Sequence, residues 1–132
     1  MSQENLSRLR AGYAALSRGT IDVELLAADF ELSQASSIID SAGTFRGRDA
    51  VREAIEEVSS SFDELEFTPE EIVDVGDGQI LVLVHARGRG RGSGMAVDDR
   101  IAHLWTFRQG KAVRLVIYEE QSEALHAVGL KE

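Results

Sequence analysis

The chain has 132 residues, a length that favours a single domain over residues 1–132. Its 23 acidic and 14 basic residues give a formal net charge of −9; a surface this acidic repels phosphates and anionic lipid, so we expect neither nucleic acid nor a membrane as partner. The absence of cysteine excludes disulfides and thiolate chemistry and, with the polar first ten residues, predicts a cytoplasmic protein.

The first segment predicts an amphipathic helix between a Ser2 cap and a Gly19 stop. Its apolar stripe at helical spacing consists of Leu6, Leu9, Tyr13 and Leu16. Thr20 is then expected to cap a short second helix that includes Leu25 and Leu26.

The helical period disappears from Phe30 to Phe45, where we expect a hairpin or two short strands and a turn at residues 40–43. A long helix is expected after Gly47, because apolar residues recur there at four, three and four residues. This stripe consists of Val51, Ile55, Val58 and Phe62. We interpret the acidic run at residues 63–71 as a solvated edge.

The remainder predicts a meander of strands joined by turns at residues 76–78, 93–94 and 109–110, and then a short helix over residues 122–128 that ends at Gly129. The strands are expected at residues 71–75, 80–91, 95–108 and 111–120. Helices, strands, one long helix and four strands, in that order, indicate an α+β fold with helices packed on one face of a curved antiparallel sheet.

Two-residue turns at residues 93–94 and 109–110 would fix the register of the last three strands. His103 would then lie opposite Val84, Trp105 opposite Arg114, and Ile101 opposite Tyr118. One face of the sheet would carry Val84, His103, Trp105, Arg114, Tyr118 and Glu120. The other face is also rich in apolar residues, so we expect a second copy of the chain to cover it in a sheet-to-sheet homodimer.

Five segments of the chain resemble, in order and spacing, the SnoaL-like branch of the nuclear transport factor 2-like superfamily. They read YAALSRGT, LLAADFEL, TFRGRDAVREAI, HLWTFRQGKAVRL and YEEQSEALHAVGL. The resemblance covers nearly the whole chain. It implies a cone-shaped fold with a pocket between the concave face of the sheet and the helices, often closed off by a dimer. It implies no single activity, because this fold hosts enzymes, binding proteins and catalytically silent members.

The ketosteroid isomerase relatives need a carboxylate base and two buried donors. In this chain the base falls near Gln34, the buried acid near His103, and the donor tyrosine near Gly12, with Tyr13 one place off. The chain departs at all three positions, so we do not expect that mechanism. In the polyketide cyclase relatives an acid or base lies toward the end of the last strand, and the nearest candidate is Glu120.

Each candidate residue also has a structural interpretation. His103 could move a proton or orient a ligand carbonyl, or it could be a buried histidine satisfied by a neighbour. Trp105 could stack on a ligand, and the hydroxyls of Tyr13 and Tyr118 could point inward, but all three also fit core packing. Arg114 could meet a ligand carboxylate, although we favour an internal pair with Glu120 or Asp99.

No cofactor is expected. The histidines at positions 85, 103 and 126 form no metal-ligand spacing, and there is no glycine-rich phosphate loop. The alternating arginines and glycines at residues 87–92 resemble a nucleic-acid-binding segment, but the acidic charge favours a structural hairpin whose arginines pair with local acids.

The hypothesis that follows is a dimeric pocket protein for a small, mostly apolar ligand with a polar or carbonyl end. The residues expected to contact it are Tyr13, Gln34, Val84, Trp105, Arg114 and Tyr118. One alternative is a proton-transfer enzyme of the isomerase, cyclase or hydrolase type that uses His103 and Glu120. Another is a protein interaction module.

Overall fold

The computed structural model describes residues 3–34 and 44–130, which form three helices and a six-stranded sheet. In chain order the elements are α1 (Gln3–Ser17), β1 (Leu26–Gln34), β2 (Phe45–Arg46), α2 (Arg48–Ser60), β3 (Phe62–Gly76), β4 (Gln79–Gly90), β5 (Ala96–Arg108), β6 (Lys111–Tyr118) and α3 (Gln121–Ala127). The expected turn at residues 40–43 and the Ser2 cap lie outside the described residues.

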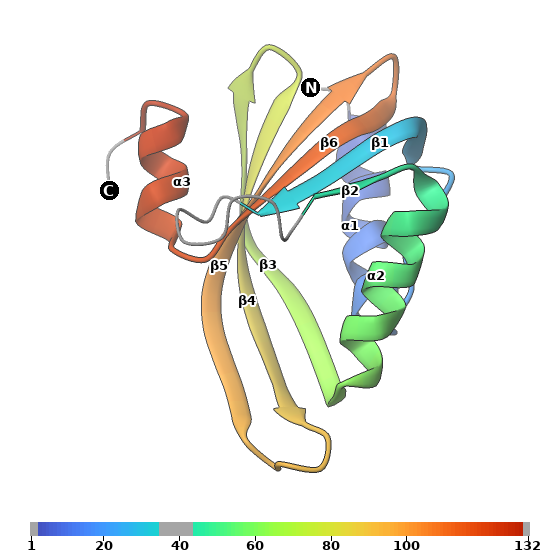
Figure 1. Ribbon diagram of the computed structural model, residues 1–132. Coiled ribbons are helices and arrows are strands. Elements are labelled where there is room, and N and C mark those ends of the chain that lie inside the picture. The colour runs from blue at the N-terminus through green and yellow to red at the C-terminus, as the bar shows by residue number, and fades with distance from the viewer. Residues whose placement is uncertain (1–2, 35–43, 131–132) are drawn as a thin grey trace.

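The strands lie in the order β2-β1-β6-β5-β4-β3 in one curved sheet. This confirms the α+β class predicted from the sequence. Two details differ. The sheet is mixed, because β1 runs parallel to β6 while the other neighbours are antiparallel. The helices also divide between the faces, since α1 and α2 lie on one side of the sheet and α3 on the other (Figure 1).

The short helix expected from Thr20 does not form. Residues 18–25 are turns and irregular chain, and Leu26 begins β1. The Asp22 carboxylate accepts a hydrogen bond from the Glu24 backbone N–H at 3.1 Å, a local turn that competes with helix. Leu25 and Leu26 are fully buried at the entry to β1, so packing and turn chemistry together outweigh the helical signal.

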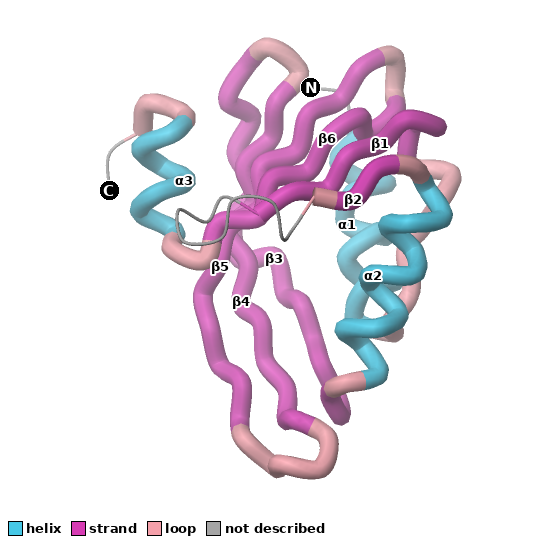
Figure 2. The backbone as a smooth tube through the Cα atoms, viewed as in Figure 1, coloured by secondary structure: helices cyan, strands magenta, loops and turns pink. Residues whose placement is uncertain are grey.

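Polar contacts also connect α1 and α2 to the sheet. The Arg48 guanidinium of α2 donates to the Leu26 carbonyl oxygen through Nε at 3.0 Å and Nη2 at 2.7 Å. The Ser17 hydroxyl at the end of α1 accepts from the Phe67 backbone N–H at 3.0 Å. Figure 2 shows α2 alongside the part of β3 that continues past the other strands.

The β4–β5 register differs from the expected one by two residues, because the connection is a longer loop over residues 91–95. The Gly90 N–H donates to the Met95 carbonyl oxygen at 2.8 Å, and His103 lies opposite Val82 rather than Val84. Since side chains alternate with a period of two, this shift leaves every face assignment in β4 and β5 unchanged.

The β5–β6 register differs by one residue, which has a larger effect. The turn is tight as expected, with Arg108 opposite Lys111, but a bulge follows at Thr106 and Phe107. Beyond it Trp105 lies opposite Leu115, and His103 opposite Ile117. An extra residue in one strand exchanges the faces of all residues beyond it. Our expectation that Arg114 and Tyr118 share the face of His103 is therefore wrong.

Two apolar cores result, one on each side of the sheet. The larger core lies under α1 and α2 and contains Tyr13, Val84 and Trp105. The smaller core lies under α3, where Ala124 packs with Leu81 and Leu104, and Tyr118 packs against this group. Part of the second face is therefore covered by the chain's own last helix.

The matched turns at residues 77–78 and 109–110 allow a test of close packing at one glycine. Gly78 and Gly110 have nearly equal φ values, +77° and +78°. A Cβ at Gly78 would lie 2.6 Å from the Phe107 carbonyl oxygen, whereas one at Gly110 would meet nothing within 4 Å. We expect Gly110→Ala to cost about 1 kcal/mol of stability and Gly78→Ala about 2–3 kcal/mol. Urea unfolding measures both, and equal losses would contradict the steric argument.

Candidate functional site

A cavity of about 510 Å³ lies between α2 and the inner face of the sheet. Most of its lining is apolar. The lining residues are Leu16, Leu32, Gln34, Phe45, Ala54, Ile55, Glu57, Val58, Ser59, Ser61, Phe62, Leu65, Phe67, Ile101, His103, Leu115 and Ile117. Each of the elements α1, α2, β1, β2, β3, β5 and β6 contributes at least one of them, so the cavity depends on the whole arrangement of helices around the sheet.

Strand alternation and the β6 bulge determine which residues of β5 and β6 line the cavity. Ile101, His103 and Trp105 are two residues apart in β5, so they share the inner face. The bulge places Leu115 and Ile117 of β6 beside them, and both line the cavity. The amphipathic stripe predicted for α2 supplies the opposite wall, because its half-buried Ile55 and its exposed Val58 both line the cavity.

Three buried side chains from α1 and β5 form a hydrogen-bonded group at the inner end of the cavity. The Trp105 indole N–H donates to the Tyr13 hydroxyl oxygen at 2.9 Å. The Tyr13 hydroxyl is also hydrogen-bonded to His103 Nδ1, at 2.7 Å. The rings of Tyr13 and His103 stack with an interplanar angle of 12°, and Trp105 meets Tyr13 edge-on at 82°.

Burial dominates the electrostatics of this group. The exposed fractions are 1% for Tyr13, 2% for Trp105 and 3% for His103. Burial lowers the pKa of His103 from 6.5 to about 4, so the imidazole is neutral at pH 7. Burial also raises the pKa of Tyr13 far above its ordinary value of 10, so its hydroxyl keeps its proton.

His103 is the one polar or charged residue apart from tyrosine and tryptophan that is buried in the described part of the chain. It lines the cavity with Gln34, which is exposed at the end of β1. Tyr13 and Trp105 are absent from the lining, so they lie behind His103 and support it. Val84 is fully buried in the larger core and does not line the cavity either.

The structure does not bring the other predicted site residues to the cavity. Arg114 lies on the outer side, with 58% of its side chain exposed, and faces Glu31 at 3.9 Å rather than Glu120 or Asp99. Glu120 is exposed and occupies the N-cap position of α3. Tyr118 packs in the core beneath α3. The β6 bulge explains why the side chains of Arg114 and Tyr118 lie on the face of the sheet opposite the cavity.

Sequence reasoning missed the cavity wall formed by the first part of β3. Phe62, Leu65 and Phe67 all line the cavity, but their spacing of three and then two residues matches neither a helix nor a regular strand. The cause is an irregularity between Asp63 and Glu66 in the β3–β4 ladder. A bulge of this kind keeps three apolar side chains on one face while breaking their alternation.

The alternating arginine–glycine run has a structural role in the β4–β5 hairpin. A Cβ at Gly88 would lie 3.0 Å from the Leu65 Cα, so the bare backbone allows β3 to approach closely. Arg91 Nε donates to the Asp63 carboxylate at 3.1 Å. For Arg91 this is the pairing with a local acid that was expected for the arginines of this run.

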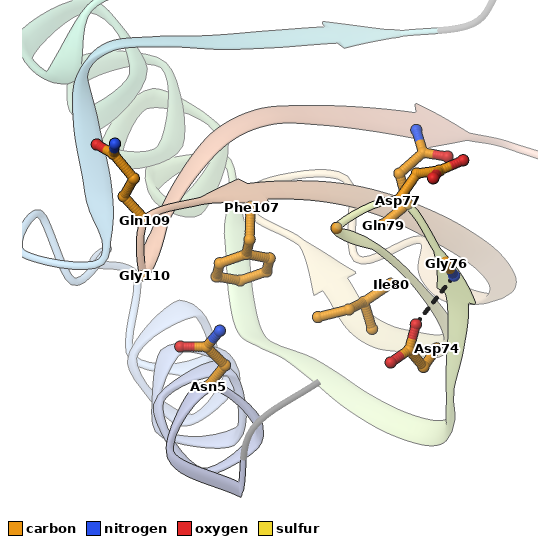
Figure 3. Close-up of a pocket in the computed structure, with 10 residues that line it drawn as sticks. Asn5, Asp74, Gly76, Asp77, Gln79, Ile80, Phe107, Gln109 and Gly110 are labelled. Atoms are coloured by element: carbon orange, nitrogen blue, oxygen red, sulfur yellow. Dashed lines mark hydrogen bonds between the residues drawn. The ribbon is translucent and has the colours of Figure 1, made fainter.

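A smaller cavity of about 320 Å³ lies near the start of α1, beside two hairpin turns. Figure 3 shows Asn5, Phe107 and Ile80 facing this space and Asp74 hydrogen-bonded to the Gly76 backbone N–H, at 2.9 Å. No histidine lines it, and its polar lining residues are exposed or half-buried. In the described ranges, no group of three acidic or histidine side chains is arranged to hold a metal ion. The larger cavity is therefore the candidate site.

Comparisons with known proteins agree with this fold. A family model described as a SnoaL-like domain matches residues 9–115. A solved NTF2-like protein of unknown function from Burkholderia pseudomallei is 25% identical, with a TM-score of 0.74 over 97% of this chain and 98% of that one. A search of curated proteins found no significant match. No helix in the described ranges is long and apolar enough to cross a membrane.

Two further solved structures share the fold. The first is TerC, co-crystallised with polyporic acid, which is 21% identical with a TM-score of 0.71 over 94% of this chain and 96% of that one. The second is a SnoaL-like polyketide cyclase from Jannaschia, which is 16% identical with a TM-score of 0.68 over 98% and 92% of the two chains.

The low pKa of His103 predicts a specific pH dependence of stability. Between pH 6.5 and about 4 the unfolded chain gains a proton at this position and the folded chain does not. Stability is therefore lost as the pH falls through this window, by about 3 kcal/mol at pH 4 relative to pH 7. His103→Asn keeps an acceptor for Tyr13 but cannot titrate. The stability that this variant loses between pH 7 and pH 4 should therefore be about 3 kcal/mol smaller than the loss in the wild type. Urea unfolding at both pH values measures the difference, and parallel pH profiles for the two proteins would contradict the assignment.

Proposed function

The chain belongs to the SnoaL-like domain family, and on that premise we propose that it binds a small, mostly apolar molecule in the cavity beneath α2. The observation that carries the proposal is an apolar space of about 510 Å³ with one buried polar side chain, His103, in its wall. Ligand sites in proteins typically have this size and this composition, in which few polar groups set the orientation.

The apolar lining supports a ligand with a large apolar part. Leu32, Ile55, Phe67 and Leu115 are buried or half-buried around the cavity. Covering apolar area of the ligand would supply most of the binding free energy, at about 25 cal/mol per Å². An interaction module that uses only its outer surface would have no need of this space, so that alternative has less support.

The proton-transfer alternative also has less support. Glu120, its proposed partner for His103, is exposed at the N-cap of α3 and does not line the cavity. Burial holds the pKa of His103 at about 4, so the imidazole is a weak base at neutral pH. A neutral imidazole is better suited to orienting a ligand by a hydrogen bond than to removing a proton.

We also propose that the chain forms a homodimer through the outer face of the sheet. Half-buried apolar residues remain around the core beneath α3. They include Val73, Val75, Leu83, Val116 and Tyr118. A second copy would bury this area. The cysteine-free, acidic composition supports a cytoplasmic location.

A neutral apolar dye tests the binding proposal without knowledge of the natural ligand. N-phenyl-1-naphthylamine becomes more fluorescent when it enters an apolar site, and we expect saturable binding to the wild-type protein. Ala54 lines the cavity from α2, so Ala54→Trp should fill part of the space and weaken binding by about tenfold or more. Fluorescence titration gives both dissociation constants.

The matched control is Glu53→Trp, which adds the same side chain at an exposed position of the same helix outside the cavity. Its affinity for the dye should stay close to that of the wild type. Equal weakening by both substitutions, or the absence of saturable binding to the wild-type protein, would overturn the proposal.

Native mass spectrometry at micromolar concentration tests the dimer. We expect a dimeric mass for the wild type and a shift toward monomer for Leu83→Asp, because a charge would then stand in the apolar outer face. The control is Arg108→Asp, which also introduces a carboxylate, in place of a cation, at an exposed residue of β5 beside the tight turn. A wild-type protein that is monomeric at this concentration would contradict the proposed interface.

A further inference from the structure

The hydrogen bonds of Trp105, Tyr13 and His103 have a defined direction. An indole N–H can only donate, so the Tyr13 hydroxyl oxygen accepts the hydrogen bond from Trp105. Burial keeps the hydroxyl proton on Tyr13 at every ordinary pH, and this proton needs an acceptor. In the described part of the chain the available acceptor is His103 Nδ1, 2.7 Å away.

This direction fixes the tautomer of His103. A neutral imidazole carries one proton, on Nδ1 or on Nε2. If Nδ1 accepts from Tyr13, Nε2 carries the proton. The opposite tautomer would donate from Nδ1 to Tyr13 and leave the buried hydroxyl proton without an acceptor among the described residues, which is unfavourable at this depth. The Nε2–H form is therefore the stable one.

The Nε2–H group faces the cavity. Within the described residues, the one hydrogen bond of His103 is made through Nδ1, and every fully enclosed side-chain nitrogen or oxygen has a partner. Nε2 has no such partner, so it is not fully enclosed. His103 itself lines the cavity, which is the open space beside it. The imidazole thus presents a buried donor to a cavity whose lining is mostly apolar.

We propose that the Nε2–H of His103 selects a ligand with a neutral acceptor oxygen of the carbonyl type, and that Tyr13 and Trp105 are positioning residues that hold this donor in place. The inference rests on the proposed ligand-binding function and names the class of ligand. The ligand oxygen would accept from Nε2–H while its apolar part fills the space beneath α2.

The surroundings of His103 argue against a charged ligand. Among the lining residues in the described part of the chain, Glu57 is the one ionisable residue besides His103, and it is exposed. A carboxylate would therefore lose its hydration without a cation in the described lining to compensate. An ammonium group placed beside His103 would face the Nε2–H donor, which cannot accept a hydrogen bond from it. A carbonyl oxygen loses less on desolvation and matches the buried donor of His103.

The tautomer can be tested in the ligand-free protein. Long-range ¹H–¹⁵N spectra of protein labelled with ¹⁵N-histidine distinguish Nε2–H from Nδ1–H. We expect the Nε2–H pattern for wild-type His103 at pH 7. In Tyr13→Phe the donor to Nδ1 is lost, so the pattern should change to the other tautomer or to a mixture. A purely structural role for Tyr13 would leave the pattern unchanged.

Ligand selection can be tested with benzophenone and diphenylmethane, which differ in one carbonyl oxygen. Competition against N-phenyl-1-naphthylamine gives both affinities. We expect the preference for benzophenone over diphenylmethane to be about fivefold greater in the wild type than in His103→Phe, which keeps a ring but has no donor. An equal preference in the two proteins would overturn the role of His103 in selection.

The outcomes separate the two proposals. Dye binding with an Nδ1–H pattern for the wild type would overturn this inference and leave the binding function standing. An Nε2–H pattern with no binding of dye or ketone would overturn the binding function, and the ligand class with it. The Nε2–H pattern together with the carbonyl preference supports both. The first test needs no variant, so it stands even if His103→Phe does not fold.

Discussion

The Tyr13 hydroxyl is buried in the core, where it must both accept and donate a hydrogen bond. Its partners, Trp105 and His103, lie two residues apart on one strand, while Tyr13 is on a helix 90 residues earlier than His103. This hydroxyl therefore links α1 to β5 through two hydrogen bonds. The fold has to keep both partners in place, because an unpaired polar group at this depth would offset much of a small domain's stability.

The irregularities of the strands decide which side chains reach the cavity. The bulge at Thr106 and Phe107 brings Leu115 and Ile117 inward and sends Arg114 out toward Glu31. The irregularity after Asp63 keeps an apolar wall on β3. Without the first of these, a guanidinium would stand beside His103, and the space would suit an anion. One extra residue in β6 thus keeps a cation out of the cavity lining.

The fold class could be predicted from the sequence because it rests on local signals: the helical stripes, the turns and the order of elements. The inward positions of His103 and Trp105 followed from alternation within β5. The faces of Arg114 and Tyr118 did not, because residues 112–117 are apolar on both faces except at Arg114, and no local pattern marks the bulge. The contact of Tyr13 with His103 depends on tertiary packing between residues 90 positions apart. The sequence pattern marks both as candidates but does not indicate that they are in contact.

Both edges of the sheet are poor templates for another strand. At one edge β2 has only two residues. At the other, β3 is long, but its ladder is interrupted at three places, Pro69 lacks a backbone donor, and its exposed side chains are largely acidic. Proline, bulges and like charges all oppose edge-to-edge pairing. The chain can therefore hold a long β-strand at the rim of an open sheet with little tendency toward amyloid-like growth, a hazard that a flat apolar edge of the same length would carry.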